Sequence, residues 1–348
     1  METKEFLTRM AGVPHVSGYE DDLVTLVSAE FSKFAEVSVD KFGNLIALKK
    51  GTGGGPKVMF TAHMDEIGMM VSVICDNGFV KFSRVGGIDA RNMLAQEVTI
   101  HGREKVFGVI GIKPPHLTSE AERKKAVELH DMSIDTGYSK EALEKLIKPG
   151  DIITFNQGLV ELKNGKIAGR ALDNTVSVAA MYCAMKNLEH YSHSADVYFV
   201  ASAQEEVGLR GAITATYNIK PDIGIAIDVT FGRGGGLTEQ ESCELGKGPA
   251  IYVGPNINRK LYEMLKKTAG AHNIAYQIRV APGVTGTDAM AIQVSEGGVI
   301  TGLLSIPQNY MHSTVETNAI SDIENCGRLV SGFVTGLQGK DWEDELCY

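Results

Sequence analysis

Apolar strand-like runs alternate with segments of helical spacing from about residue 168 to the end of the chain. The runs are DVYFVAS, IGIAID, PAIYV, AYQIRV and VITGLLSI, and helical patterns follow Asp173, Gly208 and Asp288 and cover RKLYEMLKKTAGAH. Such alternation needs crossovers that cover both faces of a sheet. We therefore predict an α/β fold with a mixed, mostly parallel sheet and helices on both faces.

The first 66 residues fit the same unit. Apolar residues at helical spacing predict a helix near residues 20–34, preceded by Ser17 and Glu20 in the S-x-x-E pattern of a capping box. A hairpin is expected over residues 37–50, and KVMFTA then predicts a strand that leads to His63.

The stretch from 67 to 167 has another pattern. Short strand-like runs recur with turn residues between them, and helical spacing is confined to SKEALEKLI. Such a pattern is typical of a small β-barrel or sandwich. Because it interrupts the α/β pattern, we expect an α/β domain formed by residues 1–66 and 168–348, with residues 67–167 inserted as a second, β-rich domain.

Composition argues against several function classes. The net charge of -9 disfavours nucleic acid and anionic membranes as partners, because clustered basic side chains bind those surfaces. No stretch approaches the roughly 20 apolar residues that cross a bilayer, and the chain does not begin with a signal-peptide pattern, so we expect a cytoplasmic protein. The 5 cysteines include no Cys-x-x-Cys pair, which disfavours a disulfide framework or a thiolate zinc site.

Potential metal ligands follow several of the predicted strands. Ligands bind in open α/β sheets at the carboxyl ends of the strands, so these side chains could gather in one crevice. Imidazoles and carboxylates without thiolates suit zinc, cobalt or manganese. The candidates are His63, Asp173, Glu205, Glu206, Asp228 and His312.

Each candidate also has a structural interpretation. Asp173 could cap a helix, and Glu205 with Glu206 could form a solvated helix start. Either histidine could be a hydrogen-bonded structural residue. Asp228 is the hardest to explain in this way, because it follows an apolar strand that should stay buried. The shared position at one crevice favours a site.

Motifs over nearly the whole length support a family resemblance. The chain resembles the glutamyl aminopeptidase family, which includes the tetrahedral aminopeptidases and some members labelled cellulase M or endoglucanase. The resemblance implies the fold of the di-metal exopeptidases. The motifs are PHVSGYE, AHMDEIG, GRALDN, ASAQEEVGLRGA, IAIDVT, GKGPAI, TGTDAMAIQ and YMHSTVE.

The resemblance implies two divalent metal ions per subunit, zinc before cobalt or manganese. Asp173 would bridge the ions, with His63 and Asp228 completing the ligands of one ion, and Glu206 and His312 those of the other.

The remaining acidic residues near His63 would have other roles. The resemblance makes Glu205 the general base, acting on a metal-bridged water, and Asp65 the carboxylate that orients His63. Glu66 has no role in the family pattern, and we expect a structural salt bridge for it.

The implied activity is removal of the N-terminal residue from peptides with a free N-terminus. The implied partners are further copies of the chain, because the inserted domain would be a PDZ-like dimerisation domain and dimers would form a tetrahedral dodecamer. Two alternatives are a glycan hydrolase, as the cellulase labels suggest, and a catalytically silent oligomeric scaffold. The single Trp342 gives little surface for stacking sugars, and no expected ligand is missing.

The chain departs from the family pattern at two places. Thr175 and Gln308-Asn309 stand where arginines are common, which removes fixed charge near the site. The preferred N-terminal residue, the native metal and the number of subunits stay open on sequence grounds.

Overall fold

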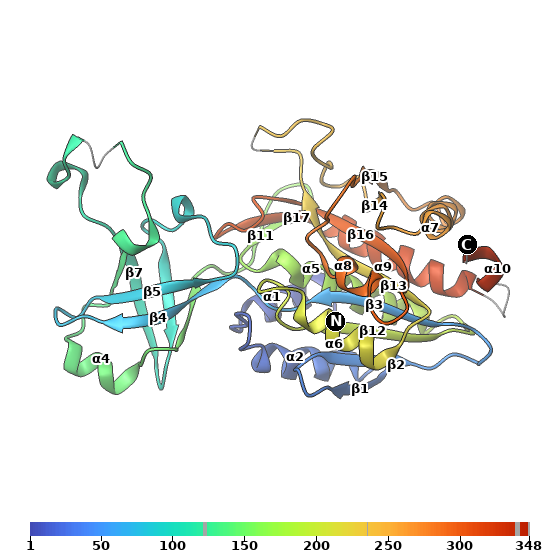
Figure 1. Ribbon diagram of the computed structural model, residues 1–348, viewed down its shortest axis with the longest axis horizontal. Coiled ribbons are helices and arrows are strands. Elements are labelled where there is room, and N and C mark those ends of the chain that lie inside the picture. Colours follow the sequence, from blue (N-terminus) through green and yellow to red (C-terminus); the bar gives the residue numbers. More distant parts are fainter. Residues whose placement is uncertain (121–123, 235, 338–341, 347–348) are drawn as a thin grey trace.

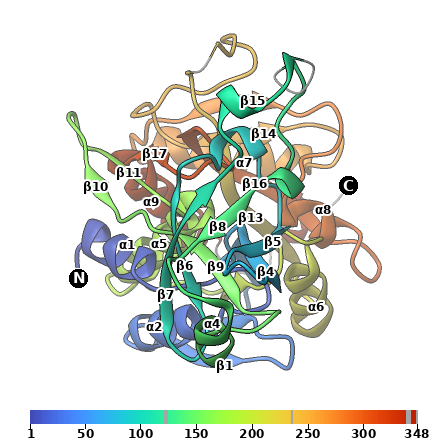
Figure 2. The ribbon, with the colours of Figure 1, turned by 90° about the vertical axis from the view of Figure 1, so that its left-hand side faces the viewer.

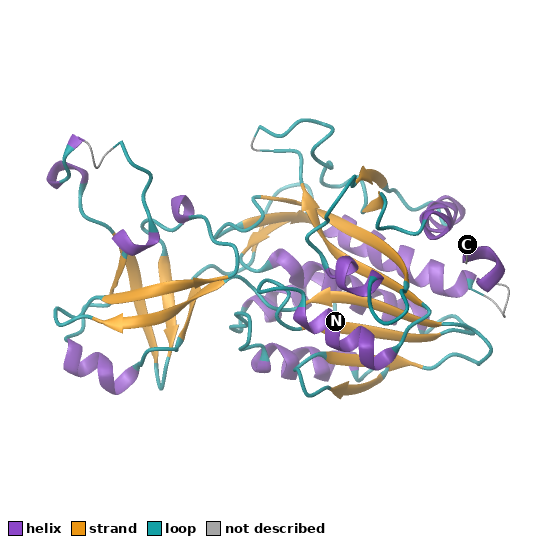
Figure 3. Ribbon diagram, viewed as in Figure 1, coloured by secondary structure: helices purple, strands orange, loops and turns teal. Residues whose placement is uncertain are grey.

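The computed structural model describes residues 1–120, 124–234, 236–337 and 342–346. An α/β body carries both ends of the described chain, and a β-barrel projects from one side of it (Figures 1 and 2). The body consists of strands covered by helices, whereas the barrel has short helical segments only at its margins (Figure 3).

The body is built on a mixed sheet of 11 strands, in the order β1-β2-β12-β3-β13-β16-β17-β11-β10, with β14 between β16 and β15. The central strands β12, β3, β13 and β16 are parallel, and the flanking pairs are antiparallel except for β14 with β15. The bounds are β1 Glu36–Val39, β2 Leu45–Lys49, β3 Lys57–His63, β10 Val160–Glu161, β11 Lys166–Gly169, β12 Asp196–Ser202, β13 Ile223–Phe231, β14 Ala250–Val253, β15 Gln277–Val280, β16 Ile300–Asn309 and β17 Glu316–Ala319.

Helices cover both faces of this sheet. On one face α5 packs against α1, α2 and α9, and on the other α6 and α8 pack together. Apolar side chains of the sheet and the helices form one continuous core, which includes the stacked rings of Phe60 and Phe199. The bounds are α1 Thr3–Ala11, α2 Asp21–Phe31, α5 Leu172–Leu188, α6 Arg210–Ile219, α7 Arg259–Ala271, α8 Asp288–Gln293, α9 Ile320–Gly336 and α10 Trp342–Leu346.

The predicted α/β fold is confirmed, with two corrections. The sheet is mixed, but parallel pairing is confined to its centre and to β14 with β15, because the peripheral hairpins add antiparallel strands. The helix expected near 20–34 ends at Phe31, and the capping box is wrong. Ser17 donates its hydroxyl to Asp65, and Glu20 accepts from the amides of Gly18 and Gln204, so both side chains bind other loops.

The β-rich stretch forms a closed barrel in the order β4-β5-β8-β7-β6-β9, with its own apolar core. A barrel was one of the two expected forms, and its PDZ-like character remains a prediction. In the body, β11 pairs with β17, and β10 pairs with the other edge of β11. The bounds are β4 Gly68–Ile74, β5 Val80–Val85, β6 Glu97–His101, β7 Lys105–Gly111, β8 Ser133–Asp135, α4 Lys140–Leu146 and β9 Ile152–Phe155.

None of the helices in the described ranges combines the length and the apolar character that crossing a membrane requires. The cysteines at 75, 183, 243 and 326 are free thiols, and Cys347 lies outside the described residues.

Candidate active site

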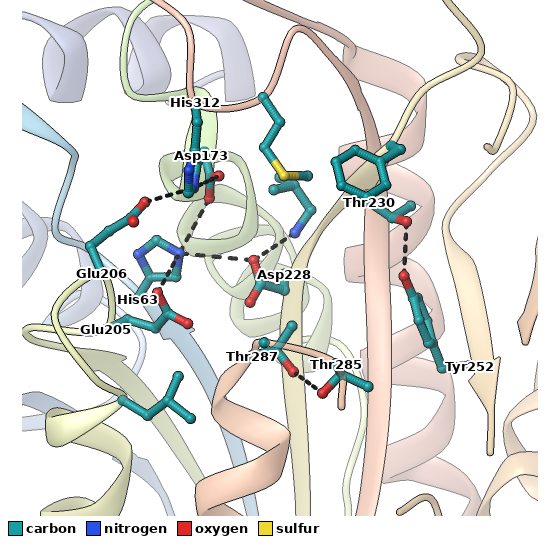
Figure 4. A pocket seen from close by; sticks show the side chains of 15 residues that line it. His63, Asp173, Glu205, Glu206, Asp228, Thr230, Tyr252, Thr285, Thr287 and His312 are labelled. Carbon is teal, nitrogen blue, oxygen red and sulfur yellow. Dashed lines mark hydrogen bonds and ion pairs between the residues drawn. The ribbon is translucent and has the colours of Figure 1, made fainter. Parts of the chain in front are cut away.

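Three neighbouring parallel strands bring the first candidate side chains together. In β3 and β12, His63 lies opposite Ser202, and the segment with Glu205 and Glu206 continues from that strand end. Asp228 lies inside β13, which continues to Phe231 rather than ending at the aspartate. Because parallel strands end at a common edge, these side chains converge on one cavity (Figure 4).

Asp173 and His312 reach the same cavity from less regular backbone. Asp173 is non-helical although it lies in the first turn of α5, and Ala171 before it and His312 have positive φ angles of 57°. The carboxylate of Glu316 accepts the N–H of Asp173 at 2.9 Å and that of His312 at 3.0 Å. Glu316, at the start of β17, therefore holds both segments in position.

Asp173 lies between the two imidazoles. Its Oδ1 is 3.2 Å from Nε2 of His63, and its Oδ2 is 3.5 Å from Nε2 of His312. The same nitrogen of His312 is 3.2 Å from Oε1 of Glu206. One carboxylate oxygen faces each histidine, which is the arrangement that a bridging ligand needs.

The other carboxylates surround His63. Its Nε2 lies 3.8 Å from Oδ1 of Asp228 and 3.9 Å from Oε2 of Glu205. Its Nδ1 lies 3.1 Å from the main-chain carbonyl oxygen of Asp65 and 3.5 Å from the carboxylate of that residue. The imidazole is thus oriented more closely by the carbonyl of Asp65 than by the side chain expected to do so.

The Asp65 carboxylate instead holds the segment after β12. It accepts the N–H of Glu205 at 2.9 Å, the N–H of Glu206 at 3.1 Å and the hydroxyl of Ser17 at 2.6 Å. Asp65 is fully buried. Its position fixes the backbone of both glutamates relative to His63.

The buried carboxylates of the cluster would be stabilised in their charged forms by a bound cation. Burial, together with neighbouring carboxylates, raises the pKa of Glu205 to about 10 and that of Asp228 to about 8. Although burial alone would lower the pKa of His63, the negative charges of Glu205 and Asp173 raise that pKa well above its usual range. The described residues that line the cavity include no lysine or arginine.

The donor set fits divalent ions. His63, Asp173 and Glu206 each offer one ligand atom within 4.8 Å of the others, and the buried Oδ1 of Asp173 accepts no hydrogen bond. Nitrogen and carboxylate oxygen are the ligands of zinc, cobalt and manganese sites. The structure brings all six predicted candidates together around one cavity.

This cavity has a volume of about 320 Å³. On the side away from the cluster, Thr230 and Tyr252 share a hydrogen bond of 2.8 Å, and Thr285 and Thr287 share one of 3.0 Å (Figure 4). The remaining lining residues are Leu209, Val229, Phe231, Gly286 and Met311. Apart from the cluster, the described residues that line the cavity are therefore uncharged.

The salt bridge expected for Glu66 is present. Its carboxylate pairs with Arg170 inside the protein and accepts the N–H of His15. Thr175 is buried and donates its hydroxyl to the carbonyl of Ala171. The side-chain amide of Gln308 is buried without a hydrogen bond to the described residues.

Three buried carboxylates near the site had no role in the site predicted from the sequence, although one of them, Glu20, was expected in a capping box. They are Glu20, Glu316 and Asp288, of which Asp288 accepts the hydroxyl of Ser202 at 2.6 Å. Each lies in a motif that carries the family resemblance, namely PHVSGYE, YMHSTVE or TGTDAMAIQ. Membership of those motifs was the only signal, because hydrophobic patterning does not show which acidic residue turns inward.

Comparisons with known proteins find matches over most of the chain. The family model described as M42 glutamyl aminopeptidase matches residues 43–329. The lysyl aminopeptidase of Pyrococcus furiosus is 38% identical over 346 residues, covering 97% of this chain and 98% of that protein.

Two solved structures share the fold over nearly the full length. An aminopeptidase from the archaeon Desulfurococcus kamchatkensis superimposes with a TM-score of 0.92 at 36% identity, covering 99% of this chain and 98% of the other. The TET1 peptidase of Pyrococcus horikoshii, which can assemble into a tetrahedron or a large octahedral shell, gives a TM-score of 0.84 at 35% identity, covering 97% and 100%.

Proposed function

Given that the chain belongs to the M42 glutamyl aminopeptidase family and is a metallopeptidase that removes N-terminal residues from peptides, we propose which of its residues carry the reaction. His63, Asp173 and Asp228 would hold one divalent ion, and Asp173, Glu206 and His312 would hold a second. The observation that carries this assignment is Asp173, whose two oxygens each face one of the two imidazoles. Zinc is the first expectation, with cobalt or manganese as alternatives.

Glu205 is proposed as the general base. When bound, the ions would polarise the scissile carbonyl and lower the pKa of the attacking water. Bound cations would also counter the effects that raise the pKa of Glu205, so its Oε2 would accept a proton from that water and return it to the leaving amine. The hydrogen bond from the Glu205 amide to Asp65 supports this role, because it holds the residue beside the ligands without using its carboxylate.

The first test is the variant Glu205→Gln, assayed with free-amine and N-acetylated aminoacyl-p-nitroanilides. Loss of the base should lower kcat by about 100-fold or more and leave the metal content unchanged. Glu144→Gln, an exposed residue of α4, is the matched control and should keep full activity. Near-normal turnover by Glu205→Gln would remove that residue from its role.

The same assay weighs the alternatives. Wild-type protein that binds ions yet releases nothing from any free-amine substrate would favour the silent scaffold. Release of sugar from a polysaccharide, without peptide hydrolysis, would favour the glycan hydrolase.

We further propose that the N-terminal side chain of the substrate is uncharged. Apart from the cluster, the described residues that line the cavity are uncharged and include Leu209, Phe231, Tyr252 and Met311, so a charged side chain that contacts them would lose hydration without an opposite charge in the lining. Leucyl and methionyl p-nitroanilides should therefore be hydrolysed at least about tenfold faster in kcat/KM than glutamyl or lysyl ones. A preference for either charged residue would contradict the proposal.

We also propose that residues 67–167 mediate dimerisation within a homo-oligomer such as a dodecamer. The assembly of the related TET1 peptidase and the exposed side chains of Phe107 and Val109 on β7 support this. The pairing of β10 and β11 in the body supports an end of the inserted domain before residue 160. Phe107→Glu should shift the mass measured by light scattering towards a smaller species, and an unchanged mass would place the contact elsewhere.

A further inference from the structure

We propose that Glu20 is a positioning residue for the segment that carries Glu205 and Glu206. This inference rests on the proposed function, because it matters only if those two glutamates act in the reaction. Glu20 ends the loop before α2 and lies far in sequence from the segment that it contacts. Glu20 is not among the described residues that line the cavity.

The contact is made by one oxygen of a buried side chain. Only 7% of Glu20 is exposed, and its Oε1 accepts the N–H of Gln204 at 3.1 Å and the N–H of Gly18 at 2.8 Å. The next two amides, of Glu205 and Glu206, donate to Asp65. Two buried carboxylates therefore hold three successive amides of the same segment.

The backbone of this segment needs such support. Gln204 has a φ angle of 56°, in the left-handed region that strains the backbone of a residue with a side chain. Relaxation of Gln204 to an ordinary conformation would turn the following peptide and move Glu205. The hydrogen bond to Glu20 opposes that relaxation directly.

The burial of Glu20 is not explained by an ion pair. The buried carboxylate within α2, that of Glu30, is 3% exposed and pairs with Arg9 and Lys33. No cation pairs with Glu20 in residues 1–120, 124–234, 236–337 or 342–346. Burial of a carboxylate costs free energy, and the hydrogen bonds from the amides of Gly18 and Gln204 offset part of that cost.

The experiment compares Glu20→Ala, Glu20→Gln and Glu30→Ala. Because a single oxygen accepts both hydrogen bonds, the carbonyl oxygen of glutamine can replace it, whereas alanine cannot. Glu30→Ala removes a buried carboxylate of α2 that does not line the cavity. Metal-loaded protein is assayed for kcat and KM with the preferred aminoacyl-p-nitroanilide, and amide hydrogen exchange is followed for the peptide that contains Gln204.

We expect Glu20→Ala to lower kcat by about 10- to 100-fold, with KM changed less than about threefold, since misplacement of a catalytic group by about 1 Å can cost 100-fold. Exchange of the amides at 204–206 should accelerate in the same variant. Glu20→Gln should recover most of kcat and slow exchange, and Glu30→Ala should keep kcat while losing thermal stability.

Two results would overturn the proposal. One is a Glu20→Ala variant that keeps kcat and unchanged exchange at 204–206, and the other is a Glu30→Ala variant with the same losses as Glu20→Ala. Absence of turnover by the wild-type protein would instead count against the proposed function, and the exchange measurement would still report on the contact of Glu20.

Discussion

Replacing Arg170 by methionine should strongly destabilise the α/β body. Arg170 is 7% exposed and Glu66 is 3% exposed, so the two charges compensate each other away from solvent. Arg170 also donates to the carbonyls of Ala11 and Val13, both at 2.9 Å. The variant leaves the buried Glu66 carboxylate with the amide of His15 at 3.2 Å and the imidazole of that residue at 3.5 Å, and it removes a donor from two carbonyls.

The expected loss follows from these contacts. Breaking a buried ion pair by removing one partner costs about 3–5 kcal/mol, and each lost hydrogen bond about 1 kcal/mol. These terms add to a loss of about 5–7 kcal/mol, which corresponds to a fall in Tm of about 10–28 °C for a unit of this size. The measurement is thermal unfolding at fixed metal concentration, because bound metal raises the apparent stability.

The double variant Glu66→Gln with Arg170→Met separates the charge from the packing. It removes the uncompensated carboxylate, so it should regain about half of the loss. Lys33→Met, which removes a surface partner of Glu30, is the control and should cost under about 1 kcal/mol. A loss below about 1 kcal/mol in Arg170→Met, or a double variant no more stable than the single one, would refute the reasoning.

Three shorter predictions concern the barrel and the ligands. Burial lowers the pKa of His101 from 6.5 to about 4, so its contribution to stability is complete above pH 6.5 and is lost as the pH falls towards 4. In His101→Gln the free energy of unfolding of the barrel should fall by about 1 kcal/mol less between pH 6.5 and 4, a figure reduced because His101 is partly exposed. An unchanged pH dependence would contradict the assignment. In Gly87→Ala the new Cβ would lie 2.8 Å from Nδ1 of His312, so the ring must move and kcat/KM should fall about tenfold or more. The control is Gly111→Ala, where a Cβ meets open space and kcat/KM should not change. Equal activities of the two variants would show that the ring adapts. Asp173→Asn should lower the occupancy of both ions together in elemental analysis, and loss of only one would contradict the bridge.

The order of elements could be predicted from the sequence, because the body follows local rules. Alternating strand and helix patterns, together with short connections, determine most of the central sheet, and the ligands follow its strands. The flanking pairs could not be predicted in the same way. The pairing of β11 with β17 joins residues more than 140 positions apart, and no local pattern specifies such a partner.

The candidate ligands and the general base could be predicted, but the residues that hold their backbone in position could not. His63, Asp228 and the two glutamates follow apolar runs, where an acidic or imidazole side chain is conspicuous. Glu20 matched the pattern of a capping box and yet binds Gln204, because that pattern shows that an acceptor is present but not which amide it meets.

The left-handed residues around the cavity have a consequence for attempts to make the protein more robust. Ala171, Gln204 and His312 have φ angles of 56–57°, and glycine adopts this conformation without strain. A screen that scores only heat resistance should therefore favour glycine at Ala171 and Gln204. The variants selected in this way would keep the fold but would hold Asp173 and Glu205 less firmly. Their kcat should therefore be measured before the substitutions are combined.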